Sequence, residues 1–292
     1  MSDGRAIRVG CRGTEFCKAQ TGAVLARINA KRPELSFDFV DIPGNGDESP
    51  ILEALGAGVI DLHIRGMREV PVELPEDVEI AACTERNDPF DVLIARDGLL
   101  LEDLPEEATL GVESSRVAVQ IGSFREDLKI EKLEGTVDRM LETLNAGKLA
   151  GFIVAAEDVE SLGWEDAVSE VFPPDILLPA AGQGSFGLLV RKGDEATAAV
   201  AQEIDHLVTR QVVKAERAFL RELNVKITDP VAVFGSFEED QLVLEALLAD
   251  EVSGAILRDD LDGEPSEEEE LGIRLAKLFV ADGARDYLAS YD

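Results

Sequence analysis

The sequence predicts an α/β protein with largely parallel sheets, followed by a small C-terminal α+β domain. Short apolar runs alternate with helical patterns through about the first 225 residues. Beyond that point three strand-like segments follow one another, and two helical segments come after them. Hydrophobic residues make up 45% of the 292 residues, enough to build folded cores although 30% are charged, so extended disorder is excluded.

The first block begins with a strand over 6–11 and a helix over 15–30, which Pro33 closes. Residues 35–42 alternate apolar and polar side chains, as a strand with one buried face does. Ser49 followed by Pro50 indicates an N-cap and a first helical proline for a short helix to about residue 57. Further strands of this block are predicted at 59–64, 78–83 and 91–95.

A second block repeats the alternation of strands and helices. Residues 136–146 carry apolar side chains at helical spacing, and 151–156 form an apolar run typical of a buried strand. The glycine-rich segment 177–187 is interpreted as a crossing back into the first block. The other elements predicted in this block are strands at 109–112 and 128–133 and a helix at 114–122.

The last part of the chain starts with a long helical pattern over 195–223. A meander of strands at 231–235, 241–248 and 254–257 follows, and then helices at 267–282 and 284–290. Ser266 and Glu269 have the spacing of a capping box for the first of these helices. We therefore expect three domains, at 1–97 with about 187–215, at 98–186, and at 216–292.

The charge balance excludes several classes of function. With 60 Asp and Glu against 28 Lys and Arg, the net charge of −32 repels nucleic acid and anionic membranes. Three scattered cysteines make no disulfide framework, and the isolated His63 and His206 predict no metal site. Without a long apolar run or a signal-like N-terminus, we expect a cytoplasmic monomer. A high-salt cytoplasm and an ordinary acidic protein both stay open as explanations of the charge.

Six segments, taken in order and spacing, resemble the porphobilinogen deaminase (hydroxymethylbilane synthase) family over about residues 6–235. The six are Arg8–Thr14 with Gln20 beyond it, Asp61–Pro71, Glu85–Asp91, Leu133–Val137, Leu178–Gly184 and Ala215–Ala218. The resemblance implies two periplasmic-binding-protein-like lobes with an active cleft between them and a small C-terminal α+β domain. It also implies an activity, in which four porphobilinogen units are joined on a dipyrromethane cofactor that a cysteine of the third domain holds by a thioether.

The resemblance assigns candidate site residues one by one. Glu69 falls at the position of the family's catalytic aspartate, where a carboxylate handles protons on pyrrole nitrogens. Arginines suit the acetate and propionate groups of each pyrrole, because guanidinium and carboxylate match in geometry and charge. The predicted substrate-binding residues are Arg12, Thr14, Arg65, Arg68, Ser114, Ser115, Arg116 and Gln183.

Several residues kept from the family pattern also have a plainer explanation, whereas Arg65, Arg68 and Arg116 are typical of an anion site because they face one predicted cleft in an acidic protein. Arg12 and Thr14 could simply begin the first helix, and Asp88 and Asp91 could order a turn. Gly182 and Gly184 could mark a crossover where a side chain would clash.

Departures from the family pattern lead to a further set of expectations. Ile227 occupies the cofactor cysteine position and carries no nucleophile, so we expect no cofactor. Cys11, Cys17 and Cys83 all lie outside the third domain, and Cys11 is the best placed of them. Val117, Glu134 and Met140 stand where the resemblance expects arginines, so a polyanion would lose its counter-charge there.

Three hypotheses follow from this sequence. The chain could be a working hydroxymethylbilane synthase, or a divergent relative that binds or transforms a different small anionic ligand in the cleft. It could also be a non-catalytic interaction module. The second hypothesis is preferred here because of Ile227, whereas enzymatic activity itself is left open.

Overall fold

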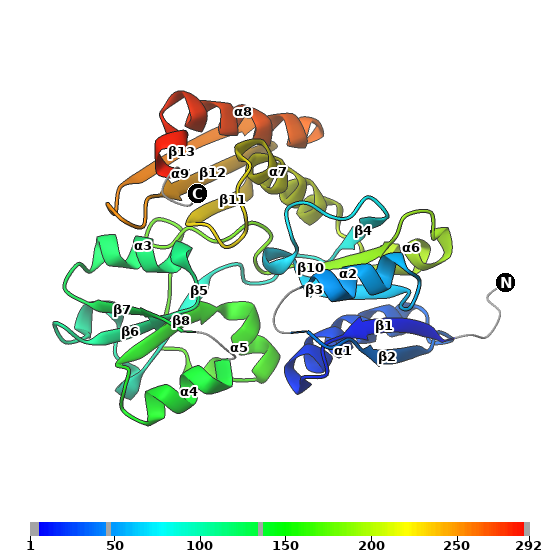
Figure 1. The fold of residues 1–292 in the computed structure, drawn as a ribbon, viewed down its shortest axis with the longest axis horizontal. Helices are drawn as coiled ribbons and strands as arrows, with labels where there is room; N and C mark the ends of the chain where they lie inside the picture. Colours follow the sequence, from blue (N-terminus) through cyan, green and yellow to red (C-terminus); the bar gives the residue numbers. More distant parts are fainter. Residues whose placement is uncertain (1–5, 45–47, 134–136, 289–292) are drawn as a thin grey trace. The chain divides into compact units, whose positions relative to one another are not determined.

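The computed structural model describes residues 6–44, 48–133 and 137–288 (Figure 1). Its first lobe is built on a five-stranded sheet in the order β2-β1-β3-β10-β4. β1, β2 and β3 run parallel, whereas β10 pairs antiparallel with both β3 and β4. The strands are β1 (Ile7–Cys11), β2 (Phe37–Asp41), β3 (Leu62–Gly66), β4 (Val78–Cys83) and β10 (Phe186–Arg191).

Helices pack on the first sheet through apolar side chains. α1 (Glu15–Lys31) and α6 (Glu195–Ala201) share one hydrophobic core with residues of β1, β3, β4 and β10. α2 (Ser49–Gly56) contacts the same four strands and buries Ile51 and Leu55. Two 3₁₀ turns complete the lobe, η1 (Met67–Glu69) and η5 (Gln202–Ile204).

The second lobe repeats this strand pattern, with its sheet in the order β7-β6-β8-β5-β9. Three strands again run parallel, and β5 pairs antiparallel with β8 and β9. The strands are β5 (Asp91–Ala95), β6 (Thr109–Val112), β7 (Lys129–Lys132), β8 (Gly151–Ala155) and β9 (Glu170–Val171).

Both faces of the second sheet are covered. α3 (Ser115–Phe124) shares one core with the sheet, and α4 (Val137–Asn145) and α5 (Ala156–Leu162) share a core on the other face. Successive residues of β5 enter alternate cores, as the period of a strand requires. The 3₁₀ turns here are η2 (Arg96–Gly98), η3 (Leu101–Asp103) and η4 (Glu165–Ala167).

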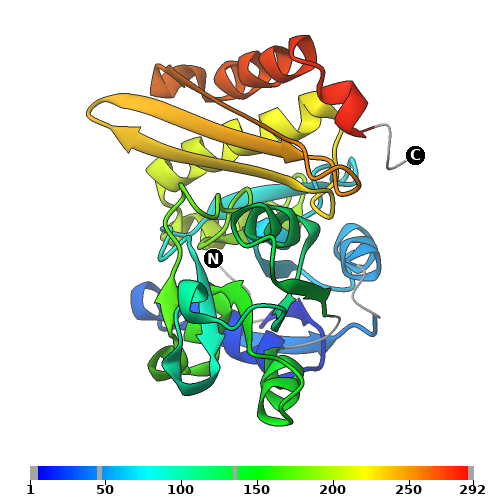
Figure 2. The same cartoon turned by 90° about the vertical axis from the view of Figure 1, so that its left-hand side faces the viewer.

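The C-terminal domain is an antiparallel meander of β11, β12 and β13 with helices beside it (Figure 2). Phe219 of α7 and Phe279 of α8 meet edge to face, with ring centroids 5.1 Å apart. Its elements are α7 (Leu207–Leu223), β11 (Val231–Glu238), β12 (Gln241–Ala249), β13 (Ile256–Gly263), η6 (Pro265–Glu267), α8 (Glu268–Ala281) and α9 (Ala284–Leu288).

The contacts divide the chain into two compact units. The first unit combines 1–86 with 185–210, and the second combines 87–184 with 211–292. The predicted fold class is confirmed, with two lobes of sheet and helix and a small C-terminal domain. The boundaries of the three domains stay a prediction.

Several predicted elements differ from the structure. The helix predicted over 195–223 is broken, because Asp205 accepts a hydrogen bond from the Cys83 backbone N–H (3.1 Å) and the His206 N–H donates to the Cys83 carbonyl (2.8 Å). These two hydrogen bonds hold residues 205 and 206 against β4, so the chain cannot continue as one helix. The predicted crossing at 177–187 ends in β10, an antiparallel strand that was not foreseen.

Two predicted helix caps are also wrong. α2 starts one residue earlier than expected, with Glu48 as its N-cap and Ser49 inside the helix. α8 begins after a 3₁₀ turn, and its N-cap Glu267 makes no capping hydrogen bond through its side chain, so Ser266 and Glu269 form no capping box. In both places a neighbouring residue starts the helix instead of the one with the favourable side chain.

We expect Gly272→Ala to destabilise the second unit by about 1–3 kcal/mol or more. A Cβ at Gly272 would lie 2.1 Å from the Ala215 backbone oxygen of α7, and backbone cannot rotate away as a side chain can. Urea unfolding followed by circular dichroism measures the change.

Gly122→Ala is the matched control, because a Cβ there meets nothing within 4 Å in α3. It should leave stability unchanged or raise it by about 0.5–1 kcal/mol. Equal effects of the two substitutions would contradict the close α7–α8 contact.

Candidate functional site

In the first lobe, the carboxylate of Glu48 contacts the side chains of Arg12, which follows β1, and of His63 and Arg65 in β3. Arg12, just after β1, donates from Nη2 to Glu48 Oε1 at 2.6 Å. From β3, His63 Nε2 lies 3.0 Å from Glu48 Oε2, and Arg65 Nε lies 3.2 Å from Glu48 Oε1. Glu48 is only 8% exposed, so the cluster is buried apart from its edge. We call these four residues the Glu48 cluster.

The hydrogen bonds of His63 fix the position of its ring. Its Nδ1 lies 3.1 Å from the Gly10 carbonyl oxygen, which can only accept, so Nδ1 carries a hydrogen. Its Nε2 faces a carboxylate that also accepts from Arg12. Both ring nitrogens therefore lie within hydrogen-bond distance of an oxygen, which fixes the orientation of the ring.

Glu69, the candidate catalytic carboxylate, lies at the edge of this cluster. It ends the 3₁₀ turn η1, directly after β3, and its side chain is 30% exposed. Arg65 Nη2 donates to Glu69 Oε1 at 2.7 Å. Arg68 lies in the same turn and adds a like charge near Arg65. The structure thus brings Arg12, Arg65 and Glu69 together through Glu48 and Arg65, and their roles in a site stay a prediction.

The charges of the Glu48 cluster shift the pKa values of Glu48 and Arg65. Burial opposes ionisation of Glu48, but the hydrogen bond with His63 and the charges of Arg65 and Arg12 outweigh it and hold the pKa of Glu48 below its ordinary value. Burial likewise opposes the charge on Arg65, yet Glu69 and Glu48 raise the pKa of Arg65 above its ordinary value. Carboxylates and guanidiniums therefore stabilise one another in the charged state.

Thr14 serves as the N-cap of α1. Its Oγ1 accepts the Cys17 backbone N–H at 3.2 Å, which satisfies one of the open donors at the helix start. The plainer explanation of this residue is thus present in the structure, and a ligand contact by Thr14 stays a prediction.

In the second unit, Arg116 is held by internal partners. Its Nη1 and Nη2 donate to the two oxygens of Asp91 at 2.9 and 2.8 Å, and Nη1 also donates to the Leu178 carbonyl at 2.8 Å. Arg116 is 6% exposed and Asp91 1%. Asp91 therefore does more than order a turn, and a ligand contact by Arg116 stays a prediction.

Gln183 lies buried in the glycine-rich segment that follows Leu178. Its Oε1 accepts from the Ala180 backbone N–H at 3.1 Å, whereas its Nε2 has no hydrogen-bond partner among the described residues. This nitrogen is a buried donor that a ligand oxygen could use.

Two buried carboxylates hold the same segment. Glu216 accepts from the Gly182 N–H at 2.7 Å, and Glu157 accepts from the Gly184 N–H at 2.8 Å. Gly184 has φ of +82°, and a Cβ there would lie 2.9 Å from the Asp88 carbonyl oxygen. The expected clash at this crossover is confirmed for Gly184.

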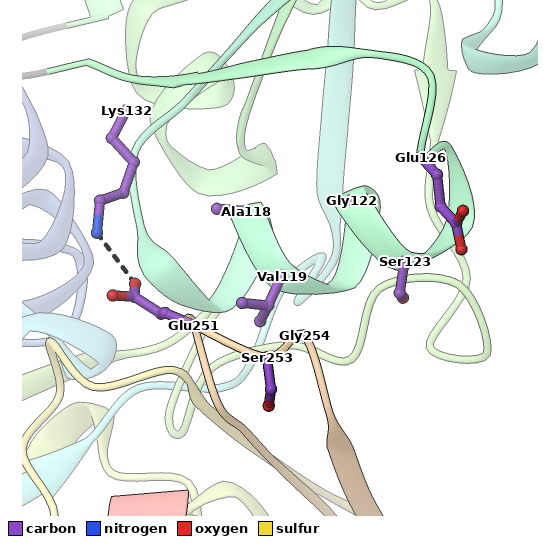
Figure 3. A pocket seen from close by; sticks show the side chains of 9 residues that line it. All are labelled: Ala118, Val119, Gly122, Ser123, Glu126, Lys132, Glu251, Ser253 and Gly254. Carbon is purple, nitrogen blue, oxygen red and sulfur yellow. Dashed lines mark hydrogen bonds and ion pairs between the residues drawn. The ribbon is translucent and has the colours of Figure 1, made fainter. Parts of the chain in front are cut away.

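Ser114 and Ser115 begin α3. Ser114 Oγ caps the helix by accepting the Val117 N–H at 3.3 Å, and Ser115 Oγ accepts from Lys132 Nζ at 2.7 Å. Lys132 also pairs with Glu251 at 3.0 Å, beside a cavity of about 560 Å³ along one side of α3 (Figure 3). Ser115 is thus tied to the turn between β12 and β13, and ligand contacts by both serines stay predictions.

Two of the four departures from the family pattern are explained by burial in a hydrophobic core. Val117 and Met140 are buried in the two cores of the second lobe. Ile227 lies between α7 and β11 and is 38% exposed. Glu134 lies outside the described residues.

Sequence reasoning missed Glu48 and His63. Glu48 comes directly before Ser49, the predicted helix cap, and no residues at metal-ligand spacing surround His63. Fifteen residues separate the two, so only the packing of α2 on β3 joins them.

Among the described residues no group of three or more His, Cys, Asp or Glu could hold a metal ion. No helix in the described ranges is long and apolar enough to cross a bilayer.

The family models and the curated relatives that match this chain all describe porphobilinogen deaminase. Residues 7–199 match the model of the porphobilinogen deaminase dipyrromethane cofactor binding domain, and 210–281 match the model of the porphobilinogen deaminase C-terminal domain. The porphobilinogen deaminase of Thermus thermophilus is 35% identical, over 98% of this chain and 99% of the relative. That of Syntrophus aciditrophicus is 33% identical over 96% of each chain.

Solved structures with some likeness include the periplasmic aliphatic sulphonate binding protein of Escherichia coli. It is 17% identical, with a TM-score of 0.44 over 75% of each chain. A lipoprotein of Enterococcus faecalis is 11% identical, with a TM-score of 0.44 over 68% of this chain and 90% of that one.

The expectation that no cofactor binds is wrong. It rested on one attachment position, Ile227, whereas the matched cofactor-binding domain spans 7–199 and does not include that residue. Within the first lobe, the guanidiniums of Arg12 and Arg65 suit the carboxylates of dipyrromethane.

Glu48→Gln should lower the unfolding free energy of the first unit by about 3 kcal/mol at pH 7, because it leaves buried cations without their counter-charge. The pKa of Glu48 is depressed in the folded state, so its contribution is present above the unfolded value near 4.5 and is lost as pH falls through the folded value. Urea unfolding of both proteins from pH 7 to 3 measures the difference, which should shrink below about pH 4.5.

Glu107→Gln provides the control, since Glu107 forms an exposed pair with Lys129. Its unfolding curve should match that of the wild type at each pH. A difference between Glu48→Gln and wild type that stays constant down to pH 3 would contradict the assigned charge state.

Proposed function

The chain belongs to the porphobilinogen deaminase family of tetrapyrrole biosynthesis, and we propose that it deaminates and joins porphobilinogen-derived pyrroles. The observation that carries this proposal is the Arg65–Glu69 pair, whose 2.7 Å bond lies at the partly exposed edge of the Glu48 cluster. It sets a carboxylate able to move protons beside a cation able to bind the substrate's acids.

Arg65 is the side chain best suited to a substrate carboxylate. Its Nη2 is taken by Glu69 and its Nε faces Glu48, whereas its Nη1 makes no hydrogen bond to the described residues. Glu48 and Glu69 fix the plane of the guanidinium, so little rotamer entropy is lost when an acetate or propionate oxygen binds Nη1. Arg12, fixed by the same Glu48, adds a second positive charge.

Glu69 handles the proton. Its Oε1 is held by Arg65, which orients the carboxylate so that an oxygen can accept a hydrogen bond from a pyrrole N–H. As positive charge develops on the pyrrole, the adjacent carboxylate stabilises it.

Dipyrromethane, when bound, supplies the pyrrole end to which further units are joined. In the first lobe its carboxylates would be held by Arg12 and Arg65.

A second candidate function is the binding or conversion of a different, smaller anionic ligand. It is favoured by the balance of charge, because Arg12 and Arg65 are already matched by Glu48 and Glu69. A polyanion needs more counter-charge than a mono- or dicarboxylate does. Ile227 at the family's cysteine position points the same way.

We expect the wild type to consume porphobilinogen with release of ammonia. Glu69→Gln should lower kcat by about 10²–10⁴-fold, the usual contribution of a proton-transferring group, with a smaller effect on KM. Arg65→Met should mainly raise KM, since it removes a carboxylate contact. Pyrrole consumption, ammonia and intact mass are measured together.

Glu107→Gln should behave as the wild type in these assays, because it lies in the exposed pair with Lys129. If porphobilinogen is not consumed but succinate raises the melting temperature, the second candidate function replaces the first. If neither compound has an effect, both proposals fail and an interaction module is favoured.

A further inference from the structure

A cavity in the second unit lies between α3 and the turn that joins β12 to β13 (Figure 3). Its volume is about 560 Å³, within the range of about 300–1,000 Å³ that is typical of small-molecule sites. None of the residues that line it has a part in the proposed pyrrole chemistry. The cavity is therefore a candidate for a second binding site.

One face of α3 forms the floor of this cavity. Ala118, Val119 and Gly122 line it, and their spacing of three and four residues places them on the same side of the helix. A Cβ at Gly122 would meet nothing within 4 Å, so the space above this glycine is open. Val119 also packs against a buried core made of Leu178, Ala232, Leu247 and Ala249. The floor is hollow because its residues are small, and the core behind Val119 supports it.

The opposite wall is a turn whose conformation Asp250 holds. Its Oδ1 accepts the Val252 N–H at 2.8 Å, and its Oδ2 accepts a hydrogen bond from Ser253 Oγ at 2.9 Å. The Gly254 N–H donates to the Asp250 carbonyl oxygen at 2.8 Å, and Gly254 adopts a φ of +71°. Hydrogen bonds thus shape this wall before any ligand binds, so little ordering entropy opposes binding.

The charged side chains at the two ends of the cavity differ in their partners (Figure 3). Near the start of α3, Lys132 Nζ pairs with Glu251 at 3.0 Å and donates to Ser115 Oγ at 2.7 Å. Beyond the end of α3, the Glu126 side chain has no hydrogen bond or ion pair with any residue that the structure describes. Among the lining residues one charge is therefore unmatched, and it is negative.

We propose that this cavity binds a small organic cation, namely an ammonium group on an apolar body. The ammonium group pairs with Glu126, and the apolar body covers Val119 and the open space above Gly122. An anionic ligand is disfavoured, because Lys132 is already matched by Glu251 and the net charge of −32 repels anions while it attracts cations. An aliphatic ammonium ion thus matches both the charge and the lining of the cavity.

Titration of the full-length protein with hexylammonium, followed by saturation-transfer NMR, tests the proposal. Hexanoate and hexan-1-ol serve as comparison probes, since they keep the apolar chain and change only the charge. Hexylammonium should bind saturably and more tightly than either of them. Absence of saturable binding, or tighter binding of hexanoate, would overturn the proposal. These measurements require no porphobilinogen, so their outcome is independent of the proposed function.

Substitutions at Glu126 test the charge of the site. Glu126→Gln should weaken hexylammonium binding by about two- to fivefold, the size expected for an exposed ion pair. Glu126→Lys should reverse the preference, so that hexanoate binds more tightly than hexylammonium. Glu107→Gln is the matched control, because Glu107 is an exposed carboxylate of the same unit outside the cavity, and it should bind as the wild type does. Unchanged hexylammonium affinity in both Glu126 variants would contradict the assigned site.

Filling the cavity provides an independent test of its location. Gly122→Leu should abolish hexylammonium binding, because the new side chain enters the open space above the helix. Gly22→Leu is the matched control, since a Cβ at this glycine of α1 also meets nothing within 4 Å and Gly22 lies outside the cavity. Circular dichroism checks that each variant is folded, and the exposed Glu126 variants decide the question if Gly122→Leu does not fold. A folded Gly122→Leu variant that binds hexylammonium as tightly as the wild type would overturn the proposal.

Discussion

The carboxylate of Glu48 contacts the side chains of Arg12, which follows β1, and of His63 and Arg65 in β3. The charges of Glu48, Arg12 and Arg65 would each cost several kcal/mol to bury alone, and they are stable together because each has a partner of opposite sign. The positions of Arg12 and Arg65, and through Arg65 the position of Glu69, follow from this one group. A rigid guanidinium beside a partly exposed carboxylate is a suitable basis for pyrrole chemistry.

Buried carboxylates also hold an arginine and backbone N–H groups in place in the second unit. Asp91 holds Arg116 through both of its oxygens, and Glu216 and Glu157 accept backbone N–H groups of the glycine-rich segment. Part of the acidity of this chain, whose net charge is −32, is therefore internal and satisfied. The sequence suggested a general surface excess together with a loss of cations at the site. The structure adds a third component, the buried carboxylates that fix loops and arginines.

The family match and the local chemistry must be considered together. Residues 7–199 carry the cofactor-binding domain of the family, and all three cysteines lie within that range. Val117 and Met140, which had indicated a lost arginine cluster, pack in hydrophobic cores, so hydrophobic burial accounts for both side chains. The departures that concern chemistry directly are Ile227 and the carboxylates that accompany Arg12 and Arg65.

The sequence by itself determined the fold class and most helices and strands, because hydrophobic periodicity encodes these directly. The resemblance of six ordered segments indicated the family and placed Arg65 and Glu69 in one motif. Only the tertiary structure joined Glu48 to His63, gave Arg116 its partner Asp91, broke the helix at Asp205 and added β10 as an antiparallel strand. These features depend on contacts between residues far apart in the chain. A buried charge or backbone group needs a hydrogen-bond or charge partner, because it has lost its contacts with water. The partner comes from the element that the tertiary fold places beside it, so the local sequence does not identify it.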